Sequence, residues 1–434
     1  MPRSRCYGFA MILPPRATVS LIAAALAAGL VAACRRSTAP PAAGAVGLRP
    51  ALTSAAGTPS VPAGSRPFDA ADALRAKVLR HAQVPAAPCL DRALGREPEL
   101  SELLEQAAHD FEKGRYEDAL ECGREAARLD AQSVAAHHFR GAALAELGRI
   151  DQARTAYSRA LALDPDDPEV LRSAADLHVR RLGSRDDLEL ALQYVQRALP
   201  RALRMKDALL QKELYLLQGM AHDDLGRPGD ALGSISMALL YDPKDREARR
   251  EKGVALFELC RFDEARTELN GLSGAEPDAW AEHYLGLIAE RQRDEADAQK
   301  HFSRATQLDP DSFKPPANAN PDRFAQVVEE EVARLPADVR RGLEKSAFAV
   351  EELPRESDLK TVDPPLSPGI LGLFKPPPEH AGRDGKPSII LYRRNLARAA
   401  RSDDELRREV RDTLLHEVGH LNGEDDDQLR ERGL

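Results

Sequence analysis

The sequence predicts a mainly helical protein, in which a long solenoid of helical hairpins is followed by a small α+β domain. The middle of the chain resembles itself at a spacing of 34 residues. Only 5% of the residues are aromatic, which is low for a β-sandwich or a barrel. After Asp311 the repeat pattern stops and short apolar runs typical of strands begin. The chain has 434 residues, enough for two or three domains, and its net charge of −9 argues against nucleic-acid binding.

Residues 1–33 form an expected signal peptide. Three arginines and no acidic residue precede an apolar run from Val19 to Ala33, which is too short to span a membrane comfortably. Small residues lead directly into Cys34, and this ending resembles the lipobox of bacterial lipoproteins. That resemblance implies a lipid on Cys34 and an anchor in the cell envelope, on the periplasmic side. Arg35 modestly favours the outer membrane; an ordinary secretory signal or a short uncleaved anchor is the alternative.

Residues 34–99 are rich in Ala, Pro and Gly and predict a flexible tether with one helix near Ala70–His81. Beyond Cys34 the chain has Cys89, Cys122 and Cys260, an odd number without paired spacing. We therefore predict no disulfide framework, with Cys122 and Cys260 as buried thiols in helices.

Residues 100–312 contain about six repeat units. Gly114, Ala119 and Ala126 of one unit recur 34 residues later as small residues of the next. Small residues allow two antiparallel helices to approach closely, and a single hairpin cannot bury its own apolar face, so such units stack. The period and pattern resemble tetratricopeptide repeats, which implies a concave surface that binds peptides or partner proteins.

Residues 319–434 predict a separate domain. A helix opening at Pro321 is expected both to cover the open end of the solenoid and to begin this domain, and a long final helix opens at Ser402, with Glu405 completing a capping box. Between them we expect a short helix at 337–345 and strands at 347–353, 370–374 and 388–392.

The final helix carries the pattern H-E-x-x-H from His416 to His420. Four helical residues turn the chain by about 400°, so the two imidazoles share one face and can bind one metal ion. Glu417 can reach a water molecule at that ion. A catalytic zinc site takes three protein ligands, and Asp426 stands at the third-ligand position of H-E-x-x-H-x-x-G-x-x-D. Asp425, Asp427 and, more remotely, Glu431 remain alternatives. No methionine follows Met237, which argues against a metzincin.

The stretches VEELP, ILGLF, PSIILYRRNL and TLLHEVGHLNGEDDD resemble the zincin-like (minimal) metallopeptidase family from about Phe324 onward. The resemblance implies zinc as cofactor, His416, His420 and Asp426 as ligands, and Glu417 as catalytic base. ILGLF or SIILY is then the strand that holds an extended substrate. The competing hypothesis is a non-catalytic tetratricopeptide scaffold lipoprotein with a structural or degenerate metal site. Glu417 favours the enzyme, because a structural site does not need this carboxylate.

Overall fold

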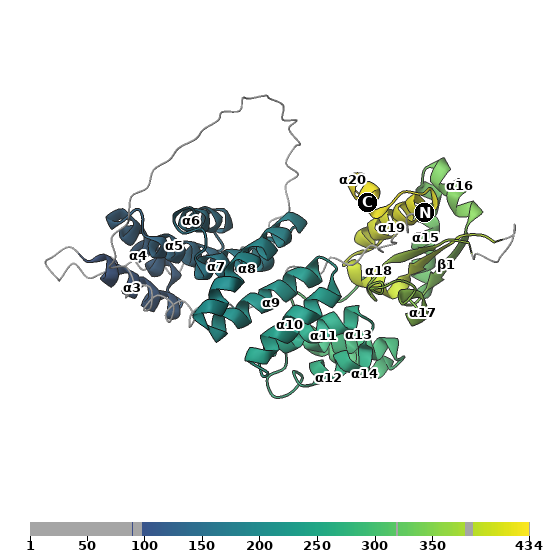
Figure 1. Ribbon diagram of the computed structural model, residues 1–434. Helices are drawn as coiled ribbons and strands as arrows, with labels where there is room; N and C mark the ends of the chain where they lie inside the picture. Colours follow the sequence, from purple (N-terminus) through teal and green to yellow (C-terminus); the bar gives the residue numbers. More distant parts are fainter. Residues whose placement is uncertain (1–88, 90–97, 318–319, 378–384, 434) are drawn as a thin grey trace, which may run out of the picture. The chain divides into compact units, whose positions relative to one another are not determined.

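The computed structural model describes residue 89 and residues 98–317, 320–377 and 385–433. The predicted signal peptide, Cys34 and the predicted helix at 70–81 lie outside the described residues. The chain divides into two compact units, with the boundary between Leu177 and His178 (Figure 1). Within the described ranges, no helix has the length and apolar character that crossing a membrane requires.

The first unit is built from helical hairpins, as the repeat predicts. Its helices are α3 (Leu100–Glu112), α4 (Tyr116–Leu129), α5 (Val134–Glu146), α6 (Ile150–Leu163) and α7 (Pro168–Leu177). The recurring small residues lie where the helices touch. A Cβ atom on Gly141 would lie 2.5 Å from the ring of Tyr157, so a larger residue there would push α5 away from α6.

The cysteine prediction is wrong for Cys122, which forms a disulfide with Cys89. The two residues are 33 positions apart, and Cys89 precedes the repeats, so the spacing gave no sign of the pair. Cys260 is a buried free thiol, as predicted. Burial raises the pKa of this thiol to about 11, which keeps it protonated and unreactive.

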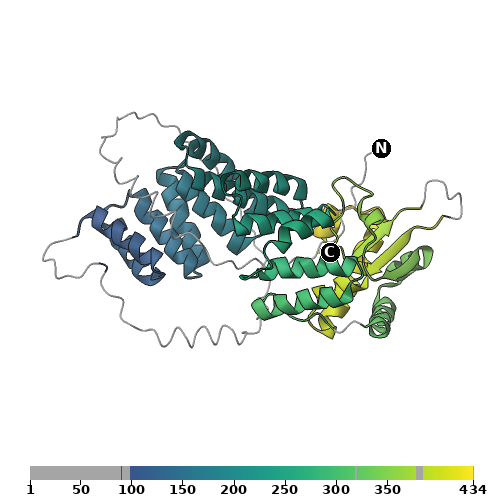
Figure 2. The same cartoon turned by 90° about the horizontal axis from the view of Figure 1, so that it is seen from below.

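The second unit also contains helical hairpins, α9/α10, α11/α12 and α13/α14, which lie side by side within it (Figure 2). Its helices are η2 (His178–Leu182), α8 (Arg185–Met205), α9 (Ala208–Asp224), α10 (Pro228–Tyr241), α11 (Arg246–Glu258), α12 (Phe262–Asn270), α13 (Ala279–Arg291) and α14 (Glu295–Leu308). The predicted helical solenoid is therefore confirmed.

The α+β domain follows in the same unit. Its elements are α15 (Pro321–Arg334), α16 (Ala337–Lys345), β1 (Ala347–Glu351), α17 (Glu356–Leu359), β2 (Gly372–Lys375), β3 (Ser388–Tyr392), α18 (Arg393–Ala399), α19 (Asp403–Leu421) and α20 (Asp426–Glu431). The strand order among the described residues is β1-β3-β2, with β1 parallel and β2 antiparallel to β3. Strands occur at all three expected places, although β1 ends two residues early.

The core of this domain lies between α15 and α19. Phe324, Val327 and Val328 of α15 pack with Leu406, Val410 and Leu414 of α19. The expectation that α15 also covers the end of the solenoid is not met. The segment from Phe313 to Ala317 and helix α18 meet the last hairpin instead, through ring contacts and ion pairs.

The last hairpins and the α+β domain share buried contacts. Cys260, in the turn before α12, belongs to one apolar cluster with residues of the sheet and the loops that precede it: Leu359, Leu366, Ile370, Leu373, Ile390 and Tyr392. Beside it, the carboxylate of Glu290 on α13 binds Arg394 at 2.8 Å and Arg398 at 2.7 Å, both on α18. We call these contacts the joint. Through these contacts, the last hairpins of the solenoid cover one side of the α+β domain.

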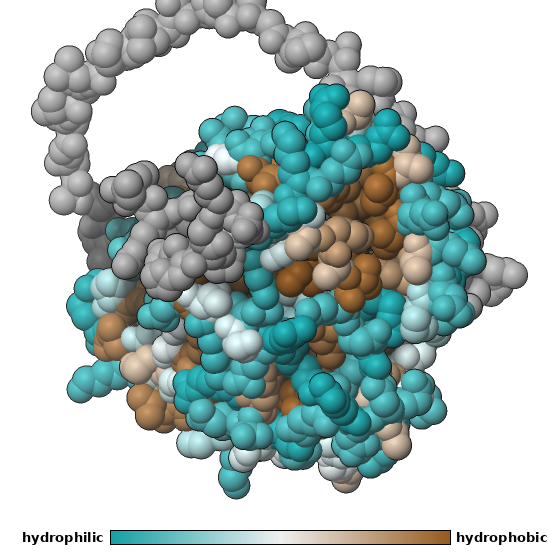
Figure 3. All heavy atoms as spheres, turned by 90° about the vertical axis from the view of Figure 1, so that its right-hand side faces the viewer, coloured by the Kyte–Doolittle hydropathy of each residue, from teal (hydrophilic) through white to brown (hydrophobic). Residues whose placement is uncertain are grey.

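The other side of the domain is more open. Strand β1 is an edge strand, and Phe348 and Val350 are 39% and 43% exposed. The view onto this end of the unit in Figure 3 shows several apolar areas, of which the largest is bordered by hydrophilic residues.

Candidate metal centre

Helix α19 presents one face to the core and another to the candidate site. Ser402 caps its first turn by accepting a hydrogen bond from the backbone N–H of Glu405. The predicted capping box is only half formed, because the Glu405 carboxylate accepts from the N–H of Arg401 instead. The buried stripe of α19 fixes the rotation of the helix, and His416 and Glu417 are then 4% and 1% exposed.

Three side chains converge at the C-terminal end of α19. The Nε2 atoms of His416 and His420 are 3.1 Å apart, and Asp426 Oδ1 lies 3.5 Å and 3.4 Å from them. Ligands held about 2.0–2.1 Å from a tetrahedral zinc ion are about 3.3–3.4 Å apart. The spacing and the nitrogen and oxygen donors therefore fit zinc, and three ligands leave a fourth position for water or substrate.

The turn into α20 gives each aspartate after Gly423 a different contact. Gly423 has a φ of +90°, which lets the chain reverse. Asp425 caps α20 by accepting from the N–H of Gln428, and Asp427 pairs with Arg430. Asp426 is the member of the run whose carboxylate lies against both histidines. Glu431 is exposed at the last position of α20.

A backbone carbonyl fixes the orientation of the His420 ring. Its Nδ1 atom lies 3.0 Å from the carbonyl oxygen of Glu424, which accepts a hydrogen bond when Nδ1 carries the proton. That tautomer leaves the lone pair of Nε2 directed at the site, as a metal ligand requires. The sequence pattern marked His420 but gave no sign of this backbone partner.

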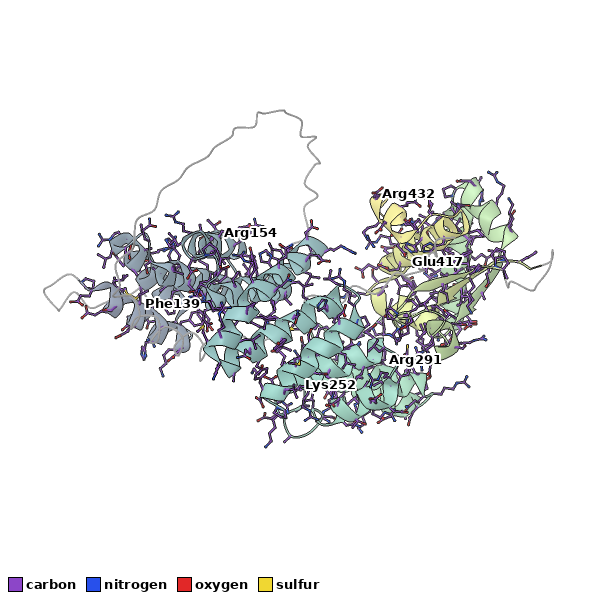
Figure 4. The ribbon with its side chains drawn as sticks, viewed as in Figure 1. Phe139, Arg154, Lys252, Arg291, Glu417 and Arg432 are labelled. Atoms are coloured by element: carbon purple, nitrogen blue, oxygen red, sulfur yellow. A yellow bond between two sulfur atoms is a disulfide. The ribbon has the colours of Figure 1, made fainter. Side chains whose placement is uncertain are left out.

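Glu417 is carried by α19 (Figure 4), and its carboxylate lies against Gly372 of the edge strand β2. Burial raises the pKa of its carboxyl to about 7, against the lowering effect of His420 and of a hydrogen bond from the backbone N–H of Phe374. A Cβ atom on Gly372 would lie 2.7 Å from Glu417 Oε1, so the strand can approach the carboxylate only with glycine at this position. Sequence reasoning missed Gly372, although a glycine inside a strand is a known sign of close backbone approach.

Gly419 is a second glycine of the site that the sequence pattern did not indicate. A Cβ atom there would lie 2.3 Å from Leu429 Cδ2 of α20. The missing side chain lets α20 pack directly on α19, and this packing carries Asp426 to the two histidines.

Comparison with known proteins defines the class of the helical repeats and of the C-terminal domain. A family model for zincin-like metallopeptidases matches residues 343–434, and models for tetratricopeptide repeats match residues 141–180 and 216–279. The chain thus carries tetratricopeptide repeats and a C-terminal zincin-like metallopeptidase domain. No curated protein is similar enough to the chain to count as a match.

Several solved structures resemble the chain. PilF of Pseudomonas aeruginosa is 17% identical, with 50% of this chain and 95% of that chain covered and a TM-score of 0.42. PilW, described as a type IV pilus biogenesis factor, is 16% identical, with 50% and 98% covered and a TM-score of 0.43. YrrB, described as a tetratricopeptide protein with an unusual peptide-binding site, is 20% identical, with 44% and 94% covered and a TM-score of 0.35. No functional conclusion follows from similarity at this level.

Proposed function

We propose that the protein is a zinc-dependent peptidase that hydrolyses peptide bonds. The observation that carries the proposal is the convergence of His416, His420 and Asp426 beside the buried Glu417, in a domain that matches zincin-like metallopeptidases. The three ligands would hold zinc, which supplies Lewis-acid polarisation of a peptide carbonyl and of a water molecule.

The protein groups around the site have separate roles. Glu417 takes a proton from the attacking water at its carboxylate and returns it to the leaving amine. Strand β2 holds an extended substrate through its outer edge. Two strands were expected candidates for this role. Strand β3 is central in the sheet and paired on both sides, so only β2 of the two has an unpaired edge that can bind a peptide.

We also propose that the repeats bind a protein or peptide and so recruit substrate or position the enzyme. Tetratricopeptide repeats present stacked helical faces suited to such partners. The joint supports a link between binding and cleavage, because the last hairpins pack directly on the peptidase domain.

For location, we propose export to the cell envelope and a lipid anchor at Cys34, on the periplasmic side and with a preference for the outer membrane. The signal-like start supports this proposal. The Cys89–Cys122 disulfide agrees with it, because such bonds persist in oxidising compartments. Mass spectrometry of the mature chain would detect the lipid. A Cys34→Ala chain that stayed in the membrane fraction would contradict the anchor.

Metal analysis and cleavage of a peptide library by the purified full chain test the peptidase proposal. We expect one zinc per chain, cleavage by the wild type, and about 100-fold or greater loss in Glu417→Gln with zinc retained. Bound zinc without any cleavage, or equal cleavage by Glu417→Gln, would favour the scaffold hypothesis.

A further inference from the structure

A cavity of about 830 Å³ lies between the last hairpin and the peptidase domain, inside the second unit. Its hairpin side is aromatic and includes Trp280 of α13, Phe302 of α14 and Phe313 of the following segment. The volume and the lining of this cavity are typical of a pocket that binds an organic ligand or a peptide segment. The cavity is larger than the volume of a single side chain.

Part of the charge around this cavity is matched within the protein, while Lys314, Arg401 and Glu409 line it as well. Arg394 and Arg398 bind Glu290, and Arg394 also binds Glu295 at 2.7 Å. The ring of His283 stacks on Phe313 with centroids 4.9 Å apart, and burial lowers its pKa to about 3, so the ring is neutral. The aromatic rings on the hairpin side favour an apolar occupant, and the ion pairs beside them leave the two arginines already neutralised.

The peptidase side of the cavity includes residues that stand close along the chain to Gly372 or to Glu417. Leu371 lines the cavity, and the next residue, Gly372, lies against the Glu417 carboxylate. Glu409 also lines it and precedes Glu417 by two turns on α19, which is about 12 Å of helix. An extended peptide covers that distance with about three or four residues.

We propose that this cavity is a distal substrate subsite, which receives an apolar segment of the peptide three or four residues from the bond that is cleaved. The proposal rests on the proposed peptidase function. It gives the last hairpin a specificity role in addition to recruitment, because Trp280, Phe302 and Phe313 would select the substrate.

Trp280 provides a direct test, because it is the only tryptophan in the chain. Three capped octapeptides of Ala and Ser serve as probes: one with Phe-Leu-Phe at its N-terminal end, one with it at its C-terminal end, and one with Ser-Ser-Ser. They are titrated into the zinc-loaded full chain carrying Glu417→Gln, which keeps the peptides intact. We expect one Phe-Leu-Phe peptide to change the Trp280 emission saturably and the serine peptide to leave it unchanged.

Two substitutions on α14 locate the effect. Ser303 lines the cavity, so Ser303→Phe would fill it, whereas Lys300, whose side chain is 70% exposed, gives the control Lys300→Phe. We expect Ser303→Phe to weaken the saturable binding about 10-fold or more and Lys300→Phe to leave it unchanged. With Glu417 restored, kcat/KM for the apolar peptide falls by a similar factor.

The outcomes separate this subsite from the peptidase itself. Trp280-detected binding that Ser303→Phe removes, in a protein that cleaves nothing, supports the cavity and defeats the peptidase proposal. Cleavage that depends neither on Phe-Leu-Phe nor on Ser303→Phe defeats the subsite and leaves the peptidase intact. An unchanged Trp280 emission with every probe also defeats the subsite.

Discussion

The candidate metal site depends on the contacts of single residues. Three consecutive aspartates follow the same turn, yet their contacts differ. Asp425 caps α20, Asp426 faces the histidines, and Asp427 pairs with Arg430. The sequence pattern predicted the histidines and Glu417, because helical spacing alone puts them on one side of α19. It could not decide among the aspartates, since that choice depends on how α20 packs against Gly419.

Asp426→Ala should lower zinc stoichiometry and affinity, because two imidazoles alone hold the ion weakly. Asp427→Ala is the matched control, since it removes a neighbouring carboxylate whose side chain is 85% exposed. Metal analysis after dialysis measures both variants. Equal zinc loss in the two, or none in Asp426→Ala, would rule out Asp426 as the third ligand.

Gly372→Ala should reduce kcat with zinc still bound, because the new Cβ would lie 2.7 Å from Glu417 Oε1 and push the carboxylate aside. Gly369→Ala is the control in the same segment, where the nearest atom to the new Cβ is 3.4 Å away. Peptide cleavage and metal content are measured together. Full activity in Gly372→Ala would show that Glu417 does not need this fit.

The helices and strands follow their sequence signals closely. Short apolar runs predicted the strands, and small residues at a fixed period predicted the hairpins. One failure is local and two came from contacts between distant parts of the chain. The Glu405 half of the capping box is diverted to Arg401, α15 packs on α19 instead of the solenoid, and Cys122 pairs with a residue before the repeats. Local sequence carries no information on the two long-range pairings.

Within the first unit, the packing of α5 on α7 should be sensitive to acid. His138 is 2% exposed and lies 2.9 Å from Ser173 Oγ, and burial lowers its pKa to about 3. Above pH 6.5 this histidine is neutral in both states, so its contribution to stability is complete. Below that pH the unfolded chain binds a proton that the folded unit resists, so stability falls as the pH approaches 3.

Lowering the pH from about 7.5 to about 5 should cost about 2 kcal/mol of unfolding free energy through His138. Urea unfolding at the two pH values measures this change. In His138→Gln, the loss of unfolding free energy between the two pH values should be smaller by the contribution of His138. His109→Gln, at an exposed position on α3, controls for the substitution itself. An identical loss in His138→Gln and the wild type would show that another group is responsible.

At the scale of the whole molecule, the joint determines whether the peptidase domain can fold without the repeats. The family model covers residues 343–434, but the sheet in that segment is buried partly by Cys260 from the repeats. The sequence predicted two domains in succession and gave no sign that they share a core. That information lies in side-chain packing between residues 106 positions apart, such as Cys260 and Leu366.

Glu290→Gln should destabilise the joint by about 3 kcal/mol, because it leaves the guanidinium groups of Arg394 and Arg398 without their shared buried carboxylate. Glu295→Gln, whose side chain is 62% exposed, should cost less than about 1 kcal/mol. Chemical unfolding followed by Trp280 emission reports on both. Equal effects of the two variants would contradict the importance of the Glu290 bridge.

The Cys89–Cys122 bond has a practical consequence for anyone who handles the protein. Synthesis in a reducing cytosol, or storage with dithiothreitol, would open it and leave two thiols able to cross-link neighbouring chains. Dithiothreitol is also a zinc chelator, so the same reagent would strip a metal held by His416, His420 and Asp426. Production by secretion and thiol-free buffers would preserve both features.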